Sequence, residues 1–351
     1  MPSAWRIAPS PPMDWHSSEA IGNLYLSDNE AKPAAPGPRS ALVRIKAAAL
    51  NARDAMVIAR SPAFPNVAKP HLIAGGDGAG VVEAVGPDSR WKIGDTVLLT
   101  TNLWVDGDVL VMDRSTSLGA GDQDGTLTEY AVLADDRLVP APTHLSSAEA
   151  AALGLAAGTA SNALFYGPQP FKKGMTVLTQ GTGGVSCFAI QLASASGATV
   201  IATSSSDEKL ETARKLGATH LINYTKTPDW AAEVLRITQG KGVDHVLDLG
   251  GVGTVAQSIR SVRPGGLVSL IGFLAGGEPT NLIPAIVGGA KVVRGVMGSR
   301  RDMIEKAVQI INDHQLHPVI SKLYQWQDVK AAFEALVSKS GVGKIVIKVG
   351  D

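Results

Sequence analysis

The sequence predicts an α/β protein with two parts, an irregular antiparallel β domain followed by a doubly wound parallel sheet. Residues 1 to about 145 contain short strand-like segments separated by turns, whereas strands and helices alternate after Pro142. Regular alternation of strand and helix produces a parallel sheet that helices cover on both faces. The chain has 351 residues, a length at which one hydrophobic core usually stops growing, so two domains are expected.

The first part is expected to be rich in strands. Ala41–Ala49 partly alternates between apolar and polar residues, and Gly80–Val85 is rich in valine. Lys92–Leu99 combines a Gly-Asp turn with an apolar run. The stretch Asp106–Gly125 is polar and glycine-rich, which predicts a surface loop.

The second part begins with a helix that Ser146 caps and that Glu149 supports in its first turn. The alanine-rich stretch Ala148–Phe165 carries too many polar residues for a membrane span and is predicted to be a buried interdomain helix. Strands are predicted at Met175–Gln180, Ala198–Thr203, His220–Asn223, Val243–Leu249, Leu267–Phe273 and Lys291–Val296, and helices at Val185–Ser196, Asp207–Leu216 and Met303–Asn312. Gly343–Val349 is predicted to be a strand that rejoins the first domain.

The composition is that of a folded, core-rich protein, with 45% hydrophobic and 18% charged residues. Its 32 Lys and Arg balance 32 Asp and Glu, which removes the broad positive field that a nucleic-acid binder needs. A single cysteine excludes disulfides within the chain and multi-cysteine zinc clusters. The N-terminus lacks a basic start and an apolar h-region, so we expect a cytoplasmic enzyme with neither a membrane nor a nucleic-acid partner.

One glycine motif carries the strongest chemical signal. The run Gly181-Thr182-Gly183-Gly184-Val185-Ser186 follows a predicted strand and opens a predicted helix. Gly181 would make the tight turn and Gly183 would let the backbone approach a pyrophosphate, which the N–H groups and dipole of the helix N-terminus favour. A purely structural turn is the alternative, but the complete βαβ context favours a dinucleotide-binding site.

The end of the second predicted strand indicates which dinucleotide is bound. An NAD site usually has an acidic residue there for the ribose 2′-hydroxyl, whereas this chain has Thr203-Ser204-Ser205-Ser206. The first carboxylates come later, at Asp207 and Glu208, and Lys209 can supply a positive charge. We therefore expect NADP(H). In the alternative interpretation the serines serve only as helix caps.

Further motifs are spread over nearly the whole chain, at Ile73–Val82 with Gly94-Asp95, Gly125–Tyr130, Gly158-Thr159-Ala160, Leu216-Gly217-Ala218 and Ile222-Asn223-Tyr224. With these motifs the chain resembles the medium-chain dehydrogenase/reductase superfamily, and within it the zinc-free, quinone-oxidoreductase-like members. Ile73–Val82 is similar to the family's glycine-rich N-terminal signature, and Gly125–Tyr130 to its Gly-x-x-x-Glu-Tyr segment.

The resemblance implies a GroES-like, mainly β substrate domain at residues 1–150, a Rossmann-type NADP(H)-binding domain at 151–299 and a C-terminal return to the substrate domain at 300–351. It places the nicotinamide in a cleft between the domains, near Asn51, Thr159 and the turn Gly272-Phe273. The other residues it implies for the cofactor are Gly181, Gly183, Gly184 and Val185 at the pyrophosphate and Ser204, Ser205, Lys209 and Tyr224 at the 2′-phosphate.

The residues that hold catalytic zinc in related alcohol dehydrogenases are a Cys, a His-Glu pair and a later Cys or Asp. The matching positions here are Asn51, Gly76-Asp77 and the neighbourhood of Leu155, and none offers a thiolate or an imidazole. The loop that elsewhere holds a four-cysteine structural zinc contains no cysteine. The resemblance therefore implies no metal site.

Asn51, Arg53 and Asp54 form the main polar group outside the glycine motif. The Asn51 amide could orient the nicotinamide ribose or a substrate carbonyl, or the group could be an Asx-type turn with an Arg53–Asp54 surface pair. The sequence does not choose between these interpretations. Asp248, at the end of a predicted strand, is left equally open as a ribose contact or a strand-end hydrogen bond.

The function implied is a zinc-independent, NADPH-dependent oxidoreductase. Without a metal to polarise an oxygen, hydride must go to a strongly electrophilic carbon of a quinone or an α,β-unsaturated carbonyl. Asn51 is the candidate for steadying the enolate oxygen, and solvent or Tyr166 for supplying the proton. The alternatives are an alcohol dehydrogenase or carbonyl reductase and a weakly catalytic NADPH-binding regulatory protein, and Lys291–Val296 is the edge expected to form a homodimer.

Overall fold

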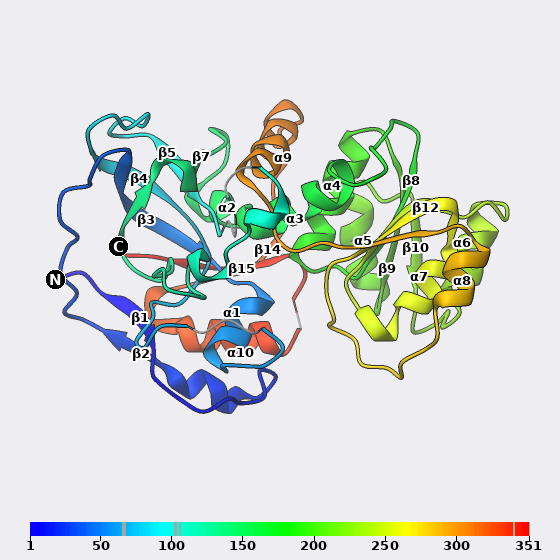
Figure 1. Ribbon diagram of the computed structural model, residues 1–351, viewed down its shortest axis with the longest axis horizontal. Coiled ribbons are helices and arrows are strands. Elements are labelled where there is room, and N and C mark those ends of the chain that lie inside the picture. Colours follow the sequence, from blue (N-terminus) through cyan, green and yellow to red (C-terminus); the bar gives the residue numbers. More distant parts are fainter. Residues whose placement is uncertain (65–67, 102–103, 105–106, 340, 351) are drawn as a thin grey trace. The chain divides into compact units, whose positions relative to one another are not determined.

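The computed structural model describes residues 1–64, 68–101, 104, 107–339 and 341–350 (Figure 1). The chain forms two compact units, unit 1 from Met1–Gly158 with Gly298–Asp351, and unit 2 from Thr159–Met297. The division falls within helix α3 (Gly154–Phe165).

Unit 1 is built on a mainly antiparallel sheet. Among the described residues seven strands take part, in the order β14-β15-β3-β4-β5-β7, with β6 paired to β3. They are β3 (Ser40–Ala49), β4 (Asp77–Val85), β5 (Thr96–Leu99), β6 (Tyr130–Ala134), β7 (Leu138–Pro140), β14 (Ile320–Tyr324) and β15 (Lys344–Lys348), and β1 (Ala4–Ile7) pairs separately with β2 (Leu24–Ser27). β15 lies antiparallel to Ala47–Ala49 of β3, which confirms that the C-terminal strand rejoins the first part of the chain.

Helices and short turns pack around this sheet. They are η1 (Ser18–Asn23), α1 (Ala52–Ile58), η2 (Val109–Val111), η3 (Arg114–Thr116), η4 (Asp135–Arg137), α2 (Ser147–Ala151), α9 (Arg301–Asp313), η6 (Trp326–Asp328) and α10 (Val329–Val337). The buried core joins residues from both ends of the chain, for example Trp5, Ile45, Leu72 and Phe333. Ser146 caps α2 and Glu149 completes its capping box, as expected.

Unit 2 is a parallel sheet. Within residues 159–297, all of which the structure describes, six parallel strands are ordered β10-β9-β8-β11-β12-β13. They are β8 (Thr176–Gln180), β9 (Thr199–Ser204), β10 (His220–Asn223), β11 (Val243–Asp248), β12 (Val262–Leu270) and β13 (Val292–Gly295). Counted in order of appearance this is 3-2-1-4-5-6, the order of Rossmann-type dinucleotide-binding sheets, so the predicted doubly wound sheet is confirmed.

The helices of unit 2 are α4 (Gly184–Ala195), α5 (Asp207–Lys215), α6 (Trp230–Ile237), α7 (Val255–Ser261) and α8 (Ile283–Gly288), with the short turn η5 (Gly251–Gly253). Ser206 caps α5, and Gly197 and Gly217 follow α4 and α5 with positive φ, as the sequence predicted. Trp230 and Ile259 pack with strand residues such as Ile201 into a core on one face of the sheet.

Several expectations were wrong in detail. β12 begins at Val262 and ends at Leu270, so Gly272-Phe273 lies beyond the strand. The expected single helix over Ala148–Phe165 is broken into α2 and α3. In the described part of the expected surface loop, 107–125, Ser117–Gly121 is buried, and the Arg53 guanidinium donates to the Ser117 hydroxyl and to Leu118 O.

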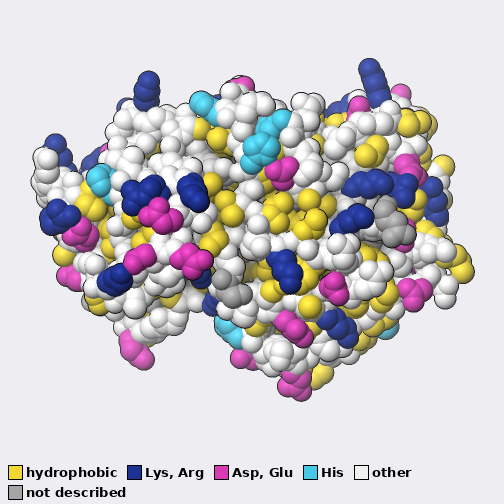
Figure 2. All heavy atoms as spheres, turned by 180° about the vertical axis from the view of Figure 1, so that it is seen from behind, with side chains coloured by type: hydrophobic (Ala, Val, Ile, Leu, Met, Phe, Trp, Pro, Cys, Tyr) yellow, Lys and Arg dark blue, Asp and Glu magenta, His cyan; other side chains and the backbone are white. Residues whose placement is uncertain are grey.

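Acidic and basic side chains are interspersed over the face drawn in Figure 2, in keeping with the zero net charge. No helix within the described ranges combines the length and apolar character that crossing a membrane requires.

Candidate functional site

The glycine turn of unit 2 is open above its backbone. β8 ends at Gln180, and Gly181 follows with φ of +73°, a conformation that favours glycine. The Gly181 N–H donates to Thr203 O of β9 at 2.8 Å, which fixes the turn at the carboxyl edge of the sheet. A Cβ added to Gly181 or Gly183 would meet nothing within 4 Å, so these glycines keep space free rather than accommodate a neighbour.

The N-terminus of α4 faces this turn. Its first helical hydrogen bond runs from Cys187 N to Gly183 O at 2.9 Å, so the N–H groups of Gly184, Val185 and Ser186 have no acceptor within the helix. The Ser186 hydroxyl donates instead to Gln180 O at 2.7 Å and closes the turn. Free N–H groups at the positive end of a 12-residue helix can bind an anionic group such as a pyrophosphate.

The next strand end carries the residues expected at a 2′-phosphate. Ser204 is the last residue of β9 and is buried, whereas Ser205 is exposed. Tyr224 follows β10, is 42% exposed, and donates its N–H to Ser204 O at 3.0 Å. Lys209 lies in the first turn of α5, where Ser206 accepts its N–H at 3.3 Å. Because parallel strands end at one edge, these residues gather beside the glycine turn.

Asp207, which follows β9 by three residues, carries a negative charge close to the expected 2′-phosphate site. Its carboxylate accepts a hydrogen bond from Asn223 Nδ2 at 2.7 Å and forms an ion pair with Lys226. The hydrogen bond from Asn223, followed by the one from Lys226, lowers the pKa of Asp207. The carboxylate is thus paired with a cation that the sequence reasoning missed, although Lys226 stands only two residues after Tyr224.

The other half of this edge is held by a buried network. Asp248 at the end of β11 is fully buried and accepts from Gly251 N at 2.8 Å, Thr254 Oγ1 at 2.7 Å and Ser258 Oγ at 2.6 Å. It is therefore a strand-end hydrogen-bonding residue, one of the two alternatives left open. A Cβ on Gly251 would lie 2.9 Å from Gly272 O, so the loops after β11 and β12 pack backbone against backbone.

Unit 2 also contains three residues that the sequence analysis assigned to the nicotinamide or to proton supply, namely Phe273, Thr159 and Tyr166. Phe273 is 54% exposed beside these loops. Thr159 is buried, and its hydroxyl has no hydrogen-bond partner among the described residues. Tyr166 follows the end of α3, where Arg294 of β13 donates to Tyr166 O at 2.9 Å and to Asn162 O at 2.7 Å.

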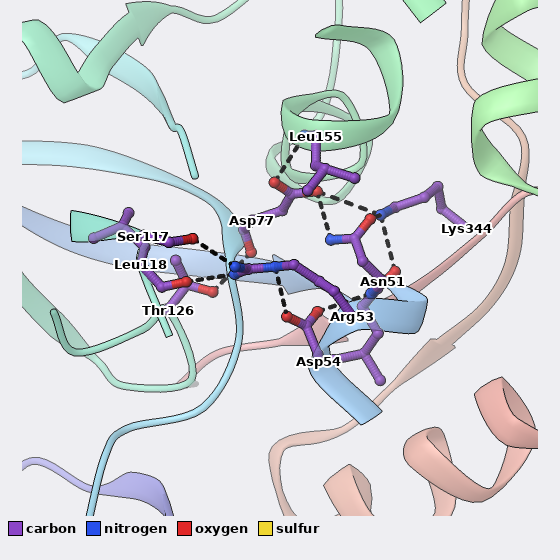
Figure 3. Close-up of polar contacts among 10 residues, drawn as sticks. Asn51, Arg53, Asp54, Asp77, Ser117, Leu118, Thr126, Leu155 and Lys344 are labelled. Atoms are coloured by element: carbon purple, nitrogen blue, oxygen red, sulfur yellow. Dashed lines mark hydrogen bonds and ion pairs between the residues drawn. The ribbon is translucent and has the colours of Figure 1, made fainter. Parts of the chain in front are cut away.

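In unit 1, Asn51 lies within a buried polar cluster (Figure 3). Its Nδ2 donates to Asp77 Oδ2 at 2.9 Å, and its Oδ1 accepts from Lys344 Nζ at 2.6 Å. A carboxylate only accepts and an ammonium only donates, so the two partners fix the orientation of the amide.

Asp77 connects this cluster to helix α3. It is the first residue of β4, it is fully buried, and its Oδ1 accepts the N–H of Leu155 at 2.8 Å. A carboxylate at a helix N-terminus is favoured by the free N–H groups and the dipole there. Gly154 makes this contact feasible, because any Cβ at Gly154 would collide with Asp77 Oδ1.

Of the two interpretations left open for Asn51, Arg53 and Asp54, the one with an Arg53–Asp54 surface pair is wrong, because both side chains are buried. Asp54 accepts the Asn51 N–H at 2.8 Å at the start of α1, and its Oδ1 lies 3.2 Å from Arg53 Nε. Arg53 also donates to Ser117 Oγ at 2.7 Å and to Leu118 O, and thereby holds the 117–121 segment inside unit 1. Neither interpretation of the sequence included this burial of both charges.

Burial and pairing compete in this cluster. Burial lowers the pKa of Lys344, while the charges of Asp77 and Asp54 oppose that shift. Burial likewise raises the pKa of Asp54, and the neighbouring Arg53 opposes it. Sequence reasoning missed Lys344. The signal that could have identified it was a lysine within the C-terminal strand that was already expected to rejoin the first domain.

Comparison with known proteins gives matches over most of the chain. Residues 184–313 match the zinc-binding dehydrogenase family and residues 37–143 the alcohol dehydrogenase GroES-like domain. The chain is 42% identical over 320 residues to a zinc-type alcohol dehydrogenase-like protein of Schizosaccharomyces pombe, covering 89% of this chain and 91% of that protein. A quinone oxidoreductase of Pseudomonas aeruginosa is 35% identical over 290 residues, 81% of each chain. A solved NAD-dependent alcohol dehydrogenase is 31% identical, with a TM-score of 0.85 over 100% of both chains.

The zinc in the name of one matched family does not fit the residues present. Asn51, Asp77 and Leu155, the positions that the resemblance aligns with zinc ligands, do lie together, but they offer an amide, one carboxylate and a backbone N–H. The Lys344 ammonium lies among them, 3.4 Å from Asp77 Oδ2. Zinc takes thiolate, imidazole and carboxylate ligands. Over the described part of the chain, no three His, Cys, Asp or Glu side chains are grouped to hold a metal.

Proposed function

Because the chain belongs to the medium-chain dehydrogenase/reductase superfamily, whose oxidoreductases use nicotinamide cofactors, we propose that it is a zinc-independent, NADPH-dependent reductase. Its substrate is a quinone or an α,β-unsaturated carbonyl compound. The observation that carries this proposal is the Asn51–Asp77–Lys344 cluster, in which a buried ammonium stands among the positions aligned with zinc ligands.

The proposed substrate class follows from the absence of a metal ion in the proposed mechanism. Without a Lewis acid, a simple ketone or alcohol oxygen is not polarised strongly enough for efficient hydride transfer. Quinones and enones accept hydride at a carbon conjugated with a carbonyl group. The electron pair of the C=C bond then moves onto the carbonyl oxygen as an enolate, which takes up a proton afterwards, so positioning alone supplies much of the catalysis. The similarity to a quinone oxidoreductase supports this choice.

The proposed preference for NADPH rests on the end of β9. Ser205, Lys209 and Tyr224 supply hydrogen-bond donors and a positive charge, and Lys226 pairs with the carboxylate of Asp207, which would otherwise repel a 2′-phosphate. One solved relative is an NAD-dependent alcohol dehydrogenase, so the preference needs a direct test.

Different residues are proposed to bind the cofactor, to stabilise the oxygen that gains negative charge and to supply the proton. When bound, the reduced nicotinamide supplies the hydride. The N–H groups at the start of α4 bind the pyrophosphate, and Thr159 and the Gly272-Phe273 turn are the proposed contacts of the nicotinamide. Asn51 Nδ2 keeps one N–H beyond the one given to Asp77, and we assign it to the oxygen that gains negative charge. Solvent or Tyr166 supplies the proton.

The test is NADPH oxidation measured side by side with quinones, enones, aldehydes and simple ketones. We expect turnover with the first two classes and little with the others. Turnover of simple alcohols or ketones only would contradict the proposal and favour a conventional alcohol dehydrogenase. NADPH binding, seen by fluorescence, without turnover of any member of the panel would favour a regulatory protein.

The cofactor preference is tested separately with Lys209→Ala. Because the lost partner is a phosphate, we expect the dissociation constant of NADPH to rise about tenfold or more while that of NADH changes little. Equal weakening of both cofactors would show that Lys209 does not contact the 2′-phosphate.

A homodimer formed through β13 is also part of the proposal. β13 is the outer strand of the unit 2 sheet and pairs on one side with β12. An unpaired strand edge is a template for joining a second copy. Light scattering should give twice the mass of the chain, and Val293→Pro, which removes an edge N–H, should shift the mass toward that of one chain.

A further inference from the structure

Lys344 is a charged side chain deep inside unit 1. It is 4% exposed, although it lies on β15, close to the C-terminus. Its Nζ donates to Leu50 O at 2.9 Å and to Asn51 Oδ1 at 2.6 Å, and lies 3.4 Å from Asp77 Oδ2. All three hydrogen positions of the ammonium therefore have acceptors.

The surroundings of Lys344 are built for a cation. Its neighbours supply a backbone carbonyl, an amide oxygen and a carboxylate, all of which are oxygen acceptors. In the same cluster Arg53 neutralises Asp54, so that two buried carboxylates face two buried cations. A buried charge without a partner is costly, so the cluster is stable only as a complete set.

We infer that the Lys344 ammonium is the resident cation of this pocket and the positioning group for Asn51. It takes the place that a metal ion would need, and it holds the Asn51 amide with Oδ1 toward β15 and Nδ2 toward Asp77. Lys344 is thus a positioning residue, since it acts through Asn51. The role of Asn51 toward a substrate oxygen rests on the proposed function, whereas the cation site does not.

The Lys344 ammonium occupies the position that a divalent metal ion would need in order to bind Asn51 and Asp77. A divalent ion could bind the oxygens of Asn51 and Asp77 together only after the ammonium had moved away from them. Lys344 is 4% exposed and is held on strand β15, which opposes such a movement. Added zinc should therefore not displace Lys344 from a folded chain.

The first experiment uses the unmodified protein. Reductive methylation followed by peptide mass spectrometry reports which lysines are accessible in the folded state. Lys348, the exposed residue at the end of the same strand, is the internal control. We expect Lys348 to be methylated at least about ten times faster than Lys344, because the reagent reaches an exposed amine and not a buried, hydrogen-bonded one. The ratio of the two rates should not change when zinc is added in excess. Methylation of Lys344 at the rate of Lys348, or its exposure by zinc, would overturn the inference.

The second experiment is a double-mutant cycle. Lys344→Met and Asp77→Asn should each lower Tm by about 10 °C, because each leaves the other charge buried and unpaired. The double variant should lose clearly less than the sum of the two, and Lys348→Met should leave Tm unchanged. Losses that simply add would show that the two charges do not form one unit.

A third readout separates this inference from the proposed function. In the double variant the Asn51 amide keeps no charged partner, so kcat for NADPH oxidation should fall while the NADPH dissociation constant stays as in the unmodified protein. Unchanged kcat would remove the positioning role. An inactive parent protein with the expected methylation pattern and coupling would refute the proposed function and leave the cation site standing.

Discussion

Units 1 and 2 each carry an aspartate–lysine pair at the site assigned to function, and the two pairs are built in opposite ways. Asp77 and Lys344 are buried, with every polar atom engaged by the fold. Asp207 and Lys226 are exposed at the end of a strand. A buried pair is costly to break, whereas an exposed pair contributes little to stability and is free to rearrange around a ligand. In our proposal, unit 1 therefore fixes the orientation of Asn51, and unit 2 provides an adaptable edge for the cofactor.

Two glycines beside the buried pair of unit 1 and two in the glycine turn of unit 2 differ in the same sense. In unit 1, Gly76 and Gly154 lie where any Cβ would collide with Arg53 or with Asp77. In unit 2, Gly181 and Gly183 face open space. The same residue type therefore permits close packing beside Asp77 and leaves open space above the turn where we propose that the pyrophosphate binds.

The largest expected effect comes from filling the space that Asp77 needs. Gly154→Ala should lower the free energy of unfolding by about 4 kcal/mol, because displacing the carboxylate breaks a buried charge cluster. Five of the six tryptophans lie in unit 1, so urea unfolding followed by tryptophan fluorescence reports mainly on that unit.

The matched control is Gly288→Ala. Gly288 also lies in a helix, α8, but a Cβ there meets nothing within 4 Å. Alanine is the better helix former, so this variant should keep its stability or gain up to about 1 kcal/mol. Because Gly288 lies in unit 2, the urea unfolding of both variants is also followed by circular dichroism, which reports on both units. A Gly154→Ala variant as stable as Gly288→Ala would contradict the described packing of Asp77.

Unit 2 also buries a titratable group, His245, but keeps it neutral, whereas unit 1 buries its charged groups as ion pairs. His245 of β11 is buried, and this burial lowers its pKa from 6.5 to about 4, opposed by Asp244 and assisted by Arg294. As the pH falls from 6.5 to 4, the unfolded chain takes up the proton first. The stability from the neutral imidazole is therefore present above pH 6.5 and declines by about 3 kcal/mol toward pH 4.

This pH dependence is measured by urea unfolding between pH 4 and pH 8, followed by circular dichroism. His245→Gln should flatten the decline. His220→Gln, at an exposed position of β10 in the same sheet, should keep it. A decline of the same size in all three proteins would show that His245 is not its source.

The next effect concerns the open glycines. Gly174 and Gly181 precede and follow β8, both have positive φ, +88° and +73°, and a Cβ at either meets nothing within 4 Å. Alanine should cost about 1–2 kcal/mol of stability at both positions. Only Gly181→Ala should weaken NADPH binding, by about 100-fold or 2.7 kcal/mol, because its methyl group enters the space above the turn. Equal affinities in the two variants, measured by fluorescence titration, would contradict the assigned pyrophosphate site.

The smallest effect tests the exposed pair. Lys226→Gln leaves Asp207 without its cation, so NADPH binding should weaken about tenfold, or about 1.4 kcal/mol, with NADH affected less. Lys215→Gln, at the far end of α5, should leave both affinities unchanged. Fluorescence titration with the two cofactors distinguishes these outcomes. An identical change for NADH would place the 2′-phosphate elsewhere.

The parallel half of the fold was predictable because its signals are local. The turn at Gly181, the caps at Ser206 and Gly217, and the alternation of strands with helices all lie within short segments. The resemblance also picked out Asn51 and Asp77, which the structure joins by a hydrogen bond.

The buried charges were not predictable from neighbouring residues. Lys344 reaches Asn51 from the opposite end of the chain, through the pairing of β15 with β3. Arg53 and Asp54 are adjacent in sequence, and their burial depends on Ser117 and Leu118, which come from a segment that composition alone marked as a surface loop. Long-range packing decided these positions.

The central claim is that this chain keeps the dinucleotide edge of its superfamily and uses internal charges where a metal would stand. It is tested most directly by measuring bound zinc and NADPH-dependent quinone or enone reduction on one purified sample, before and after chelation and after zinc is returned. We expect far less than one zinc per chain and the same rate in all three states. One zinc per chain, with activity that chelation removes and zinc restores, would contradict it.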